Sequence, residues 1–309
     1  MMATDLAAFD AWARDELAAV EAALDAWVPA NAPAGLGEAM RYGVLDGGKR
    51  LRPLLVLAAC RAVGGEREAA MRAAVAVELI HAYSLVHDDM PCMDNDVLRR
   101  GKPTVHVKYG EAQAMLAGDA MQALAFEVLT PTAGEGPASP SDGGMAPAQQ
   151  ARLVALLARS AGHAGMAGGQ AIDLASIGHG LDEAELRDMH RRKTGALLQA
   201  SVMMGAACGD TTPAVRAALS DYGWATGVAF QVVDDILDVT QSAAKLGKTA
   251  GKDQNDNKPT YVSVLGLDAA RAHAQTLRRQ AHEALAASGL GAAAAWLAVL
   301  ADKVVEREN

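Results

Sequence analysis

Two long segments of this chain have the periodicity of helices but lack a polar side, and each ends in a run of acidic residues. They are Ala70–Val86 and Ala214–Val233. A helix that is apolar on more than one face is stable in water only when other elements surround it. We therefore expect both segments to run through the middle of a helical bundle and to present their acids at its end.

The rest of the chain is also typical of helices. Apolar residues recur at spacings of three and four, only 4% of the residues are aromatic, and no alternating strand pattern of useful length occurs. The expected fold class is all-α, a single domain over residues 1–309 with roughly ten or more helices. Residues 131–149, rich in Gly, Pro and Ser, are expected to form a mobile loop. The segments with helical periodicity are Leu54–Val63, Ala69–His87, Glu111–Leu129, Gln150–Gly162, Asp182–Gly205 and Pro213–Val239.

Charge and cysteine content exclude several classes of protein. The formal net charge of −9 argues against binding along a nucleic-acid backbone. Three cysteines cannot form an even set of disulfides, which indicates a reducing compartment. The N-terminus lacks the basic start and apolar block of a signal peptide, and the most apolar stretch, Gly291–Ala301, is shorter than the roughly 20 residues that span a bilayer. We predict a cytoplasmic protein without a membrane span.

The first acidic cluster follows the segment that ends at Val86. It contains Asp88, Asp89 and Asp94. In an unbroken helix, residues 88 and 94 would lie on different sides. Pro91 cannot continue the helical hydrogen bonding, so a turn after it is expected to bring Asp94 back beside Asp88.

The second acidic cluster ends the other apolar segment. Asp234 and Asp238 are four residues apart, which places them on one helix face, and Gln231 shares that side. Carboxylates this dense repel one another unless cations neutralise them. Oxygen ligands without nearby Cys or His suit Mg²⁺ or Mn²⁺, and Mg²⁺ commonly completes its shell with substrate phosphates. A solvated acidic helix end, in a helical scaffold without activity, is the alternative.

Basic residues that suit a phosphate ligand occur at four places. They are Gly47–Pro53 (GGKRLRP), Arg99–Pro103 (RRGKP), His190–Gly195 (HRRKTG), and the pair Lys248 and Lys258. A nucleotide-binding phosphate loop is a poor interpretation, because Gly247-Lys248-Thr249 has Ser242 where that motif needs glycine.

In combination, these motifs resemble the trans-isoprenyl diphosphate synthases, most closely the bacterial-type farnesyl diphosphate synthases. The resemblance covers nearly the whole chain in order. Its motifs are GGKRLRP, ELIHAYSLVHDDMPCMDNDVLRRGKPT from Glu78, GDAMQALAF from Gly118, GMAGGQAIDL from Gly165, HRRKTGAL from His190, FQVVDDILDVT from Phe230 and LGKTAGKDQNDNKPTY from Leu246. It implies an all-α isoprenoid synthase bundle around a central cavity, usually a homodimer.

The resemblance also implies a role for each site residue. Asp88, Asp94, Asp234 and Asp238 form the metal set for three Mg²⁺ per site, with Mn²⁺ as an alternative, and Asp89, Asp235 and Asp238 hold metal-bound waters or orient basic residues. The residues implied to bind the allylic diphosphate are Arg99, Lys193 and Lys248, and Lys258 is a further implied substrate-binding residue. Those implied to bind isopentenyl diphosphate are Gly48, Lys49, Arg52, His81 and Arg100. Thr194 and Gln231 are implied to lie near the reacting allylic carbon, so that Arg99, Lys193, Thr194 and Gln231 form the catalytic group.

The implied reaction is the condensation of isopentenyl diphosphate with dimethylallyl and geranyl diphosphate to farnesyl diphosphate. In the resembling family, a tyrosine five residues before the first motif and a two-residue insertion within it accompany a fifteen-carbon product. This chain has Tyr83 and the extra pair Pro91-Cys92, and Ser84 lies one helical turn before Asp88. Tyr83 and Ser84 are therefore the expected chain-length residues.

Three alternatives remain. The first is a geranyl or geranylgeranyl diphosphate synthase, because cavity depth depends on residues from several helices. A non-catalytic subunit of a heteromeric synthase tends to lose acids from one cluster, whereas both clusters are intact here. A class I terpene cyclase would carry an Asn/Ser/Glu motif in place of the acids at 234–238 and would not need GGKRLRP.

Overall fold

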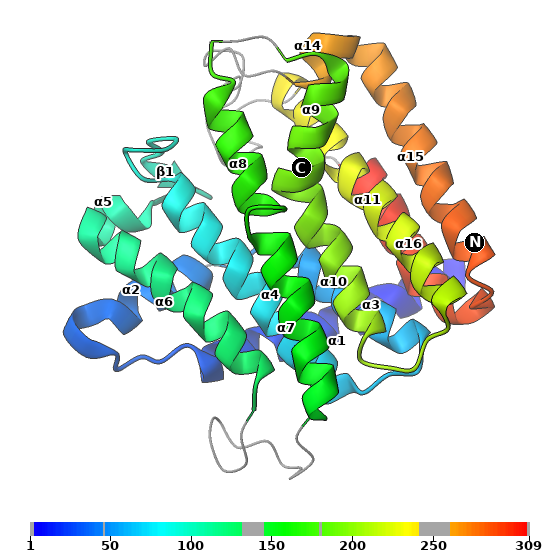
Figure 1. The fold of residues 1–309 in the computed structure, drawn as a ribbon, viewed down its shortest axis with the longest axis horizontal. Helices are drawn as coiled ribbons and strands as arrows, with labels where there is room; N and C mark the ends of the chain where they lie inside the picture. Colours follow the sequence, from blue (N-terminus) through cyan, green and yellow to red (C-terminus); the bar gives the residue numbers. More distant parts are fainter. Residues whose placement is uncertain (1–2, 46, 132–144, 179–180, 241–259, 308–309) are drawn as a thin grey trace.

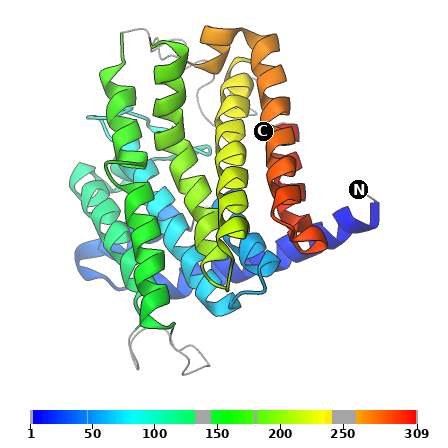
Figure 2. The same cartoon turned by 45° about the vertical axis from the view of Figure 1, so that its right-hand side comes forward.

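The computed structural model describes residues 3–45, 47–131, 145–178, 181–240 and 260–307. Over these residues the chain is almost entirely helical, so the expected all-α class is confirmed. The long helices pack side by side, and α1 runs across one end of the bundle toward α16 (Figure 1, Figure 2). The α-helices are α1 (Ala3–Trp27), α2 (Leu36–Val44), α3 (Leu51–Ala62), α4 (Arg67–Asp88), α5 (Val105–Tyr109), α6 (Glu111–Leu129), α7 (Pro147–Ala161), α8 (Met166–Ala175), α9 (Glu183–His190), α10 (Ala196–Ala206), α11 (Pro213–Thr240), α14 (Tyr261–Leu265), α15 (Leu267–Ala287) and α16 (Ala295–Glu306).

Helix α4 is a core helix because its small apolar side chains let neighbours approach on several sides. Ala73, Ala74 and Val75 are fully buried, and α4 packs against α3 and α6. By length and composition alone α4 is apolar enough to cross a membrane, but most of the apolar part of this helix is buried inside the protein. Core helices pass the same test, so the finding agrees with a helix surrounded by protein.

Helix α11 is the second core helix, and it lies between α10 and α15. A Cβ atom at Gly227 would lie 3.0 Å from the Cα of Gly195, so the glycine allows the two backbones to approach closely. This approach brings the acidic end of α11 next to the segment that joins α9 to α10. The prediction that two apolar segments with acidic ends form the interior is confirmed.

Three local details differ from the sequence prediction. The segment Asp182–Gly205 is not one regular helix, because a π-helical turn, η2 (Arg191–Gly195), separates α9 from α10. A short hairpin pairs β1 (Leu98–Arg99) with β2 (Lys102–Pro103), and strands of two residues are too short to produce an alternating pattern. Short 3₁₀ turns, η1 (Pro33–Gly35) and η3 (Gly291–Ala294), precede α2 and α16.

The predicted loop 131–149 is tested only at its ends. Helix α7 begins at Pro147, three residues before the predicted start, because proline suits the first position of a helix. Residues 132–144 lie outside the described residues.

Candidate functional site

The acidic ends of α4 and α11 line one cavity of about 630 Å³. Tyr83 and Ser84 are not part of its lining, and Lys248 and Lys258 lie outside the described residues. The predicted site residues that line the cavity are Gly48, Lys49, Arg52, His81, Asp88, Asp94, Arg99, Arg100, Lys193, Thr194, Gln231, Asp234 and Asp238. The tertiary fold therefore brings together residues from across the chain.

The first acidic cluster is shaped by the chain reversal after α4. The helix ends at Asp88, and the backbone N–H of Asp94 donates to the backbone carbonyl of Asp88 over 2.8 Å. Asn95 has a φ of 51°, in the left-handed region that asparagine tolerates. The prediction that the chain turns back after Pro91 is confirmed, and both carboxylates reach the same cavity.

Burial makes the Asp88 carboxylate costly to ionise. Desolvation, together with the negative charges of Asp94 and Asp89, raises the pKa of Asp88 to about 6. A group in this state is stabilised by any cation that enters the cavity. The oxygen-only donor set and its excess of negative charge fit a hard divalent cation.

Asp89 has a different role from its neighbour. It is 3% exposed and accepts hydrogen bonds from the Arg99 Nε, over 3.0 Å to Oδ1 and 2.9 Å to Oδ2. A second nitrogen of the same guanidinium also bonds to Asp89. Asp89 thus holds Arg99, a cavity residue from β1, in a fixed orientation.

The basic motif before α3 meets the hairpin at the cavity wall. Gly48 has a φ of 140°, and a Cβ at this position would lie 2.8 Å from a guanidinium nitrogen of Arg100. Burial and the nearby charges of Arg52 and Arg100 lower the pKa of His81 well below its ordinary value. His81 is therefore neutral at physiological pH, and the positive charge at this wall comes from the arginines and Lys49.

Within the same motif, Arg50 points into the protein core. Its side chain is 3% exposed and donates to Glu78 over 2.6 Å, to Glu21 over 2.6 Å and to the Val44 carbonyl over 2.6 Å. The sequence prediction did not single out Arg50 or Glu78. Nothing in the spacing GGKRLRP distinguishes the arginine that turns inward, since this depends on the backbone of Arg50, which has a φ of 45°.

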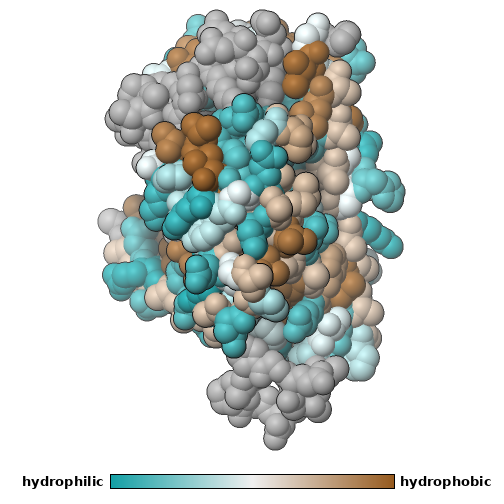
Figure 3. Space-filling view, turned by 90° about the vertical axis from the view of Figure 1, so that its left-hand side faces the viewer, coloured by the Kyte–Doolittle hydropathy of each residue, from teal (hydrophilic) through white to brown (hydrophobic). Residues whose placement is uncertain are grey.

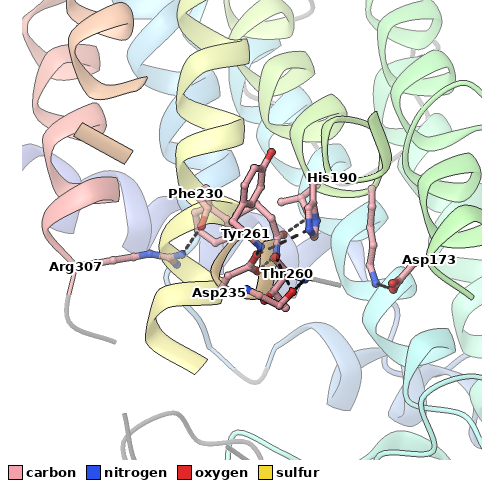
Figure 4. Close-up of polar contacts among 11 residues, drawn as sticks. Asp173, His190, Phe230, Asp235, Thr260, Tyr261 and Arg307 are labelled. Atoms are coloured by element: carbon pink, nitrogen blue, oxygen red, sulfur yellow. Dashed lines mark hydrogen bonds and ion pairs between the residues drawn. The ribbon is translucent and has the colours of Figure 1, made fainter. Parts of the chain in front are cut away.

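The π-helical turn η2 displays Lys193 and Thr194 toward the cavity. A Cβ at Gly169 of α8 would lie 2.1 Å from the backbone nitrogen of Lys193, so α8 can pack here only with a glycine. The Lys193 ammonium bonds to Asp173 of α8 (Figure 4). Single π-turns inside helices are frequent at functional sites, because they re-aim side chains that a regular helix would turn away.

In the second cluster, adjacent aspartates have different partners. Asp235 is 2% exposed and accepts from the backbone N–H of Tyr261 over 2.7 Å and from the Gln231 amide over 2.8 Å. Figure 4 shows Asp235 beside Thr260, Tyr261 and His190. Asp234 instead accepts from Arg307 over 3.2 Å.

Arg307 is a cavity residue that the sequence prediction missed. It donates to the Phe230 carbonyl over 2.6 Å, and its guanidinium carbon lies 3.9 Å from the centre of the Phe230 ring (Figure 4). A single arginine in VVEREN carries no motif, so only its position in the fold reveals it.

The acids are distributed around the cavity. Among the described residues, no group of three or more His, Cys, Asp or Glu side chains converges on one point. A divalent cation held here would therefore share its coordination sphere between protein carboxylates, water and the oxygens of a ligand, which is the usual manner of Mg²⁺.

Known proteins similar to this chain cover nearly its whole length. Geranylgeranyl pyrophosphate synthase 9, chloroplastic, from Arabidopsis thaliana is 49% identical over 296 residues, which are 94% of this chain and 79% of the relative. An FPP/GFPP synthase from Zymomonas mobilis has a TM-score of 0.83 at 38% identity, covering 97% of this chain and 99% of that one. A geranyltransferase from Helicobacter pylori, solved with magnesium and isoprenyl diphosphate, has a TM-score of 0.81 at 32% identity, covering 98% and 97%.

The prediction of a cytoplasmic location is wrong by this comparison. Plant relatives from Arabidopsis thaliana and Capsicum annuum are named as chloroplastic enzymes. Cysteine content separates reducing from oxidising surroundings but does not tell one reducing compartment from another.

A family model described as Polyprenyl synthetase matches residues 33–289. The matched range includes both acidic clusters, the basic motif before α3 and the π-helical turn. Since the match spans most of the chain and the relatives align over nearly all of it, the chain belongs to the polyprenyl synthetase family.

Proposed function

We propose that this prenyltransferase joins isopentenyl diphosphate head to tail to an allylic diphosphate and releases diphosphate. The observation that carries the proposal is the charge distribution of one cavity. Carboxylates from the ends of α4 and α11 share it with Lys49, Arg52 and Lys193. Carboxylates alone would repel diphosphates, and basic side chains alone could bind diphosphates without a metal ion. The combination suits a pair of diphosphate substrates bound together with divalent cations.

The four carboxylates Asp88, Asp94, Asp234 and Asp238 are proposed to hold Mg²⁺, with Mn²⁺ as the alternative. Bound divalent cations act as Lewis acids that neutralise the departing diphosphate. Arg99, held by Asp89, and Lys193, held by Asp173, add fixed positive charges for the same leaving group. The magnesium in the Helicobacter pylori structure supports this choice of ion.

Two substrates are proposed to bind at different walls of the cavity. The wall formed by Gly48, Lys49, Arg52, His81 and Arg100 receives the diphosphate of isopentenyl diphosphate. Breaking the allylic C–O bond leaves positive charge on the allylic carbon and both bonding electrons on diphosphate. The double bond of isopentenyl diphosphate attacks that carbon, and the released diphosphate accepts the proton lost from the product.

For the product, we propose farnesyl diphosphate, based on Tyr83 and the inserted Pro91-Cys92. Tyr83 is buried against α6, where its hydroxyl accepts a hydrogen bond from Gln122 over 3.3 Å. Geranylgeranyl diphosphate is the second candidate, because the plant relatives are named as geranylgeranyl synthases. Farnesyl diphosphate is favoured by the local motif around Tyr83, and geranylgeranyl diphosphate by the overall sequence identity to the plant relatives.

The test is an incubation of the purified protein with isopentenyl diphosphate and, in turn, dimethylallyl, geranyl and farnesyl diphosphate, with and without Mg²⁺. We expect metal-dependent diphosphate release and a fifteen-carbon product. Release with a twenty-carbon product would select the second candidate. A pure protein without turnover would contradict the proposal and leave a non-catalytic subunit.

Replacing Ser84 by phenylalanine is expected to shorten the product. Ser84 does not itself line the cavity, but it lies one turn before Asp88 on α4, so the larger ring of a phenylalanine is expected to extend toward a growing tail and stop it one isoprene unit earlier. Product chromatography should show geranyl diphosphate replacing farnesyl diphosphate. The control, Ser220→Ala, lies near the other end of α11, about 21 Å along the helix from Asp234, and should leave chain length unchanged. An unchanged chain length in Ser84→Phe would contradict this role.

We also propose a homodimer that buries the outer face of α5 and α6. Val107, Met115 and Leu116 on these helices are 50%, 41% and 53% exposed, and the side of the molecule in Figure 3 shows apolar patches among polar side chains. Burial of such side chains stabilises association. Light scattering should give twice the monomer mass of 32.0 kDa, and Leu116→Glu should shift it toward the monomer. A monomeric wild-type protein would contradict the proposal.

A further inference from the structure

A chain of hydrogen bonds connects the start of α14 to the cavity wall. The backbone N–H of Tyr261 donates to one oxygen of Asp235 over 2.7 Å, and the Gln231 amide nitrogen donates to the other over 2.8 Å. The Gln231 amide oxygen then accepts the Thr194 hydroxyl over 2.8 Å. The chain thus runs from α14 through α11 to the π-helical turn η2 (Figure 4 shows its Asp235 and Tyr261 end).

Asp235 determines which way the Gln231 amide faces. An ionised carboxylate only accepts hydrogen bonds, so it selects the NH₂ end of an amide and excludes the oxygen end. Asp235 is 2% exposed and is held in place by the Tyr261 backbone, so it cannot turn away from Gln231. The carbonyl end of Gln231 must therefore face Thr194.

The orientation of Gln231 in turn determines where the Thr194 proton lies. A hydroxyl can donate one hydrogen bond, and the Thr194 hydroxyl donates it to the Gln231 carbonyl. The remaining lone pairs of the Thr194 oxygen are left for the cavity, which Thr194 lines. An oxygen in this state attracts positive charge and cannot donate a hydrogen bond to a diphosphate.

We propose that Asp235 is a positioning residue that acts through Gln231 to point the Thr194 lone pairs at the carbon that becomes positive. This inference rests on the proposed prenyl transfer. An oriented dipole stabilises developing charge without reorganising during the reaction, which is most effective in a cavity that excludes water. Asp235 therefore serves the chemical step through Gln231, whereas Asp234 and Asp238 of the same acidic motif are the candidate metal ligands.

The substitution Asp235→Asn should reverse the direction of the hydrogen bonds between residue 235, Gln231 and Thr194. The carbonyl of the introduced amide can accept from the Tyr261 backbone, which leaves its NH₂ facing Gln231. The Gln231 amide then turns its own oxygen toward that NH₂ and its nitrogen toward Thr194. Thr194 now accepts, and its proton points into the cavity, where it repels the allylic cation. The size and position of the side chains stay the same.

The experiment is a double-mutant cycle on the single-turnover rate, measured by rapid quench with geranyl and isopentenyl diphosphates. Asp235→Asn and Thr194→Val are each expected to lower this rate roughly 10²-fold, with KM for both substrates changed by less than about threefold. Thr194→Ser, which keeps the hydroxyl, should stay within a few-fold of wild type. The double variant Asp235→Asn/Thr194→Val should be no slower than Thr194→Val alone, because Asp235 acts through that oxygen.

Gln199→Glu provides the matched control. Gln199 also connects α10 to α11 through its amide, which donates to the Ser220 carbonyl over 3.0 Å and its hydroxyl over 2.9 Å, but it does not line the cavity. Its rate should match wild type. If a thermal unfolding experiment shows that Asp235→Asn is not folded, Gln231→Leu takes its place in the cycle. Leucine cannot accept the hydrogen bond of the Thr194 hydroxyl, so this variant also leaves that hydroxyl free to point its proton into the cavity.

The outcomes separate the two proposals. A wild-type protein without turnover overturns the prenyl transfer itself. If the wild-type protein turns over but the rate losses of the two single variants multiply in the double variant, Asp235 acts independently of Thr194. That result overturns the inference. An unchanged rate in Asp235→Asn overturns it as well.

Discussion

We expect the replacement of Asp88 by asparagine to lower kcat roughly 10³-fold and at the same time to stabilise the metal-free protein. The loss of rate follows from removing one of the carboxylates proposed to hold Mg²⁺. The gain in stability follows from the raised pKa of Asp88, about 6, because the folded protein must ionise a buried group that is beside Asp94. Steady-state kinetics and urea unfolding on the same preparation measure both effects.

The pH dependence gives the sign of the stability change. The pKa of Asp88 is higher in the folded than in the unfolded state, so the folded protein binds the proton more tightly. The stability that protonated Asp88 contributes to the folded protein is present at pH 4 and is lost as the pH rises through 6. The difference in unfolding free energy between Asp88→Asn and wild type should therefore be near zero at pH 4 and about 2 kcal/mol at pH 7.5, allowing for partial exposure.

Two measurements can contradict this account of Asp88. Mg²⁺ should stabilise wild type more than Asp88→Asn, since the cation relieves the repulsion that the substitution has already removed. A stability difference that does not change with pH would show that Asp88 is not responsible. A kcat near that of wild type would remove Asp88 from the proposed metal site.

Replacing Glu78 by leucine should lower the free energy of unfolding by about 3 kcal/mol. The pair of Glu78 and Arg50 is buried, with side chains 4% and 3% exposed, so the substitution leaves an arginine inside the protein with less compensation. Glu21, at 39% exposure, remains as its second partner and limits the loss. Urea unfolding measures the change.

The same substitution should weaken isopentenyl diphosphate binding. Arg50 lies between Lys49 and Arg52, and its contacts hold the backbone that displays them. We expect KM for isopentenyl diphosphate to rise more than KM for the allylic substrate. The control is Glu183→Ala, which breaks the exposed pair with Arg187, at 51% and 49% exposure, and should cost no more than about 0.5 kcal/mol. Equal losses in the two variants would contradict the role of burial.

The helices and the cavity acids were accessible to sequence reasoning because their signals are local. Helix α6 begins and ends at the predicted residues Glu111 and Leu129, since helical periodicity is a property of neighbouring side chains. Asp88 and Asp94 were paired correctly because Pro91 forbids a continuous helix whatever surrounds it. Family motifs then connected distant segments that periodicity alone cannot join.

Other features depend on contacts that no local pattern encodes. The sequence presents Asp234 and Asp235 as equivalent, yet one bonds to Arg307 and the other to the Tyr261 backbone, 26 residues later. The π-turn at Lys193 is tied to the close packing of Gly169 from α8.

The sequence by itself determined that this chain is an all-α protein with two acidic helix ends and several basic motifs, because helix periodicity, proline and charge act over a few residues. Only the tertiary structure decided which acid faces the cavity, which arginine turns into the core and how the Gln231 amide is oriented. These choices depend on burial and on hydrogen-bond partners, such as Glu78 and Tyr261, that the fold brings from distant parts of the chain.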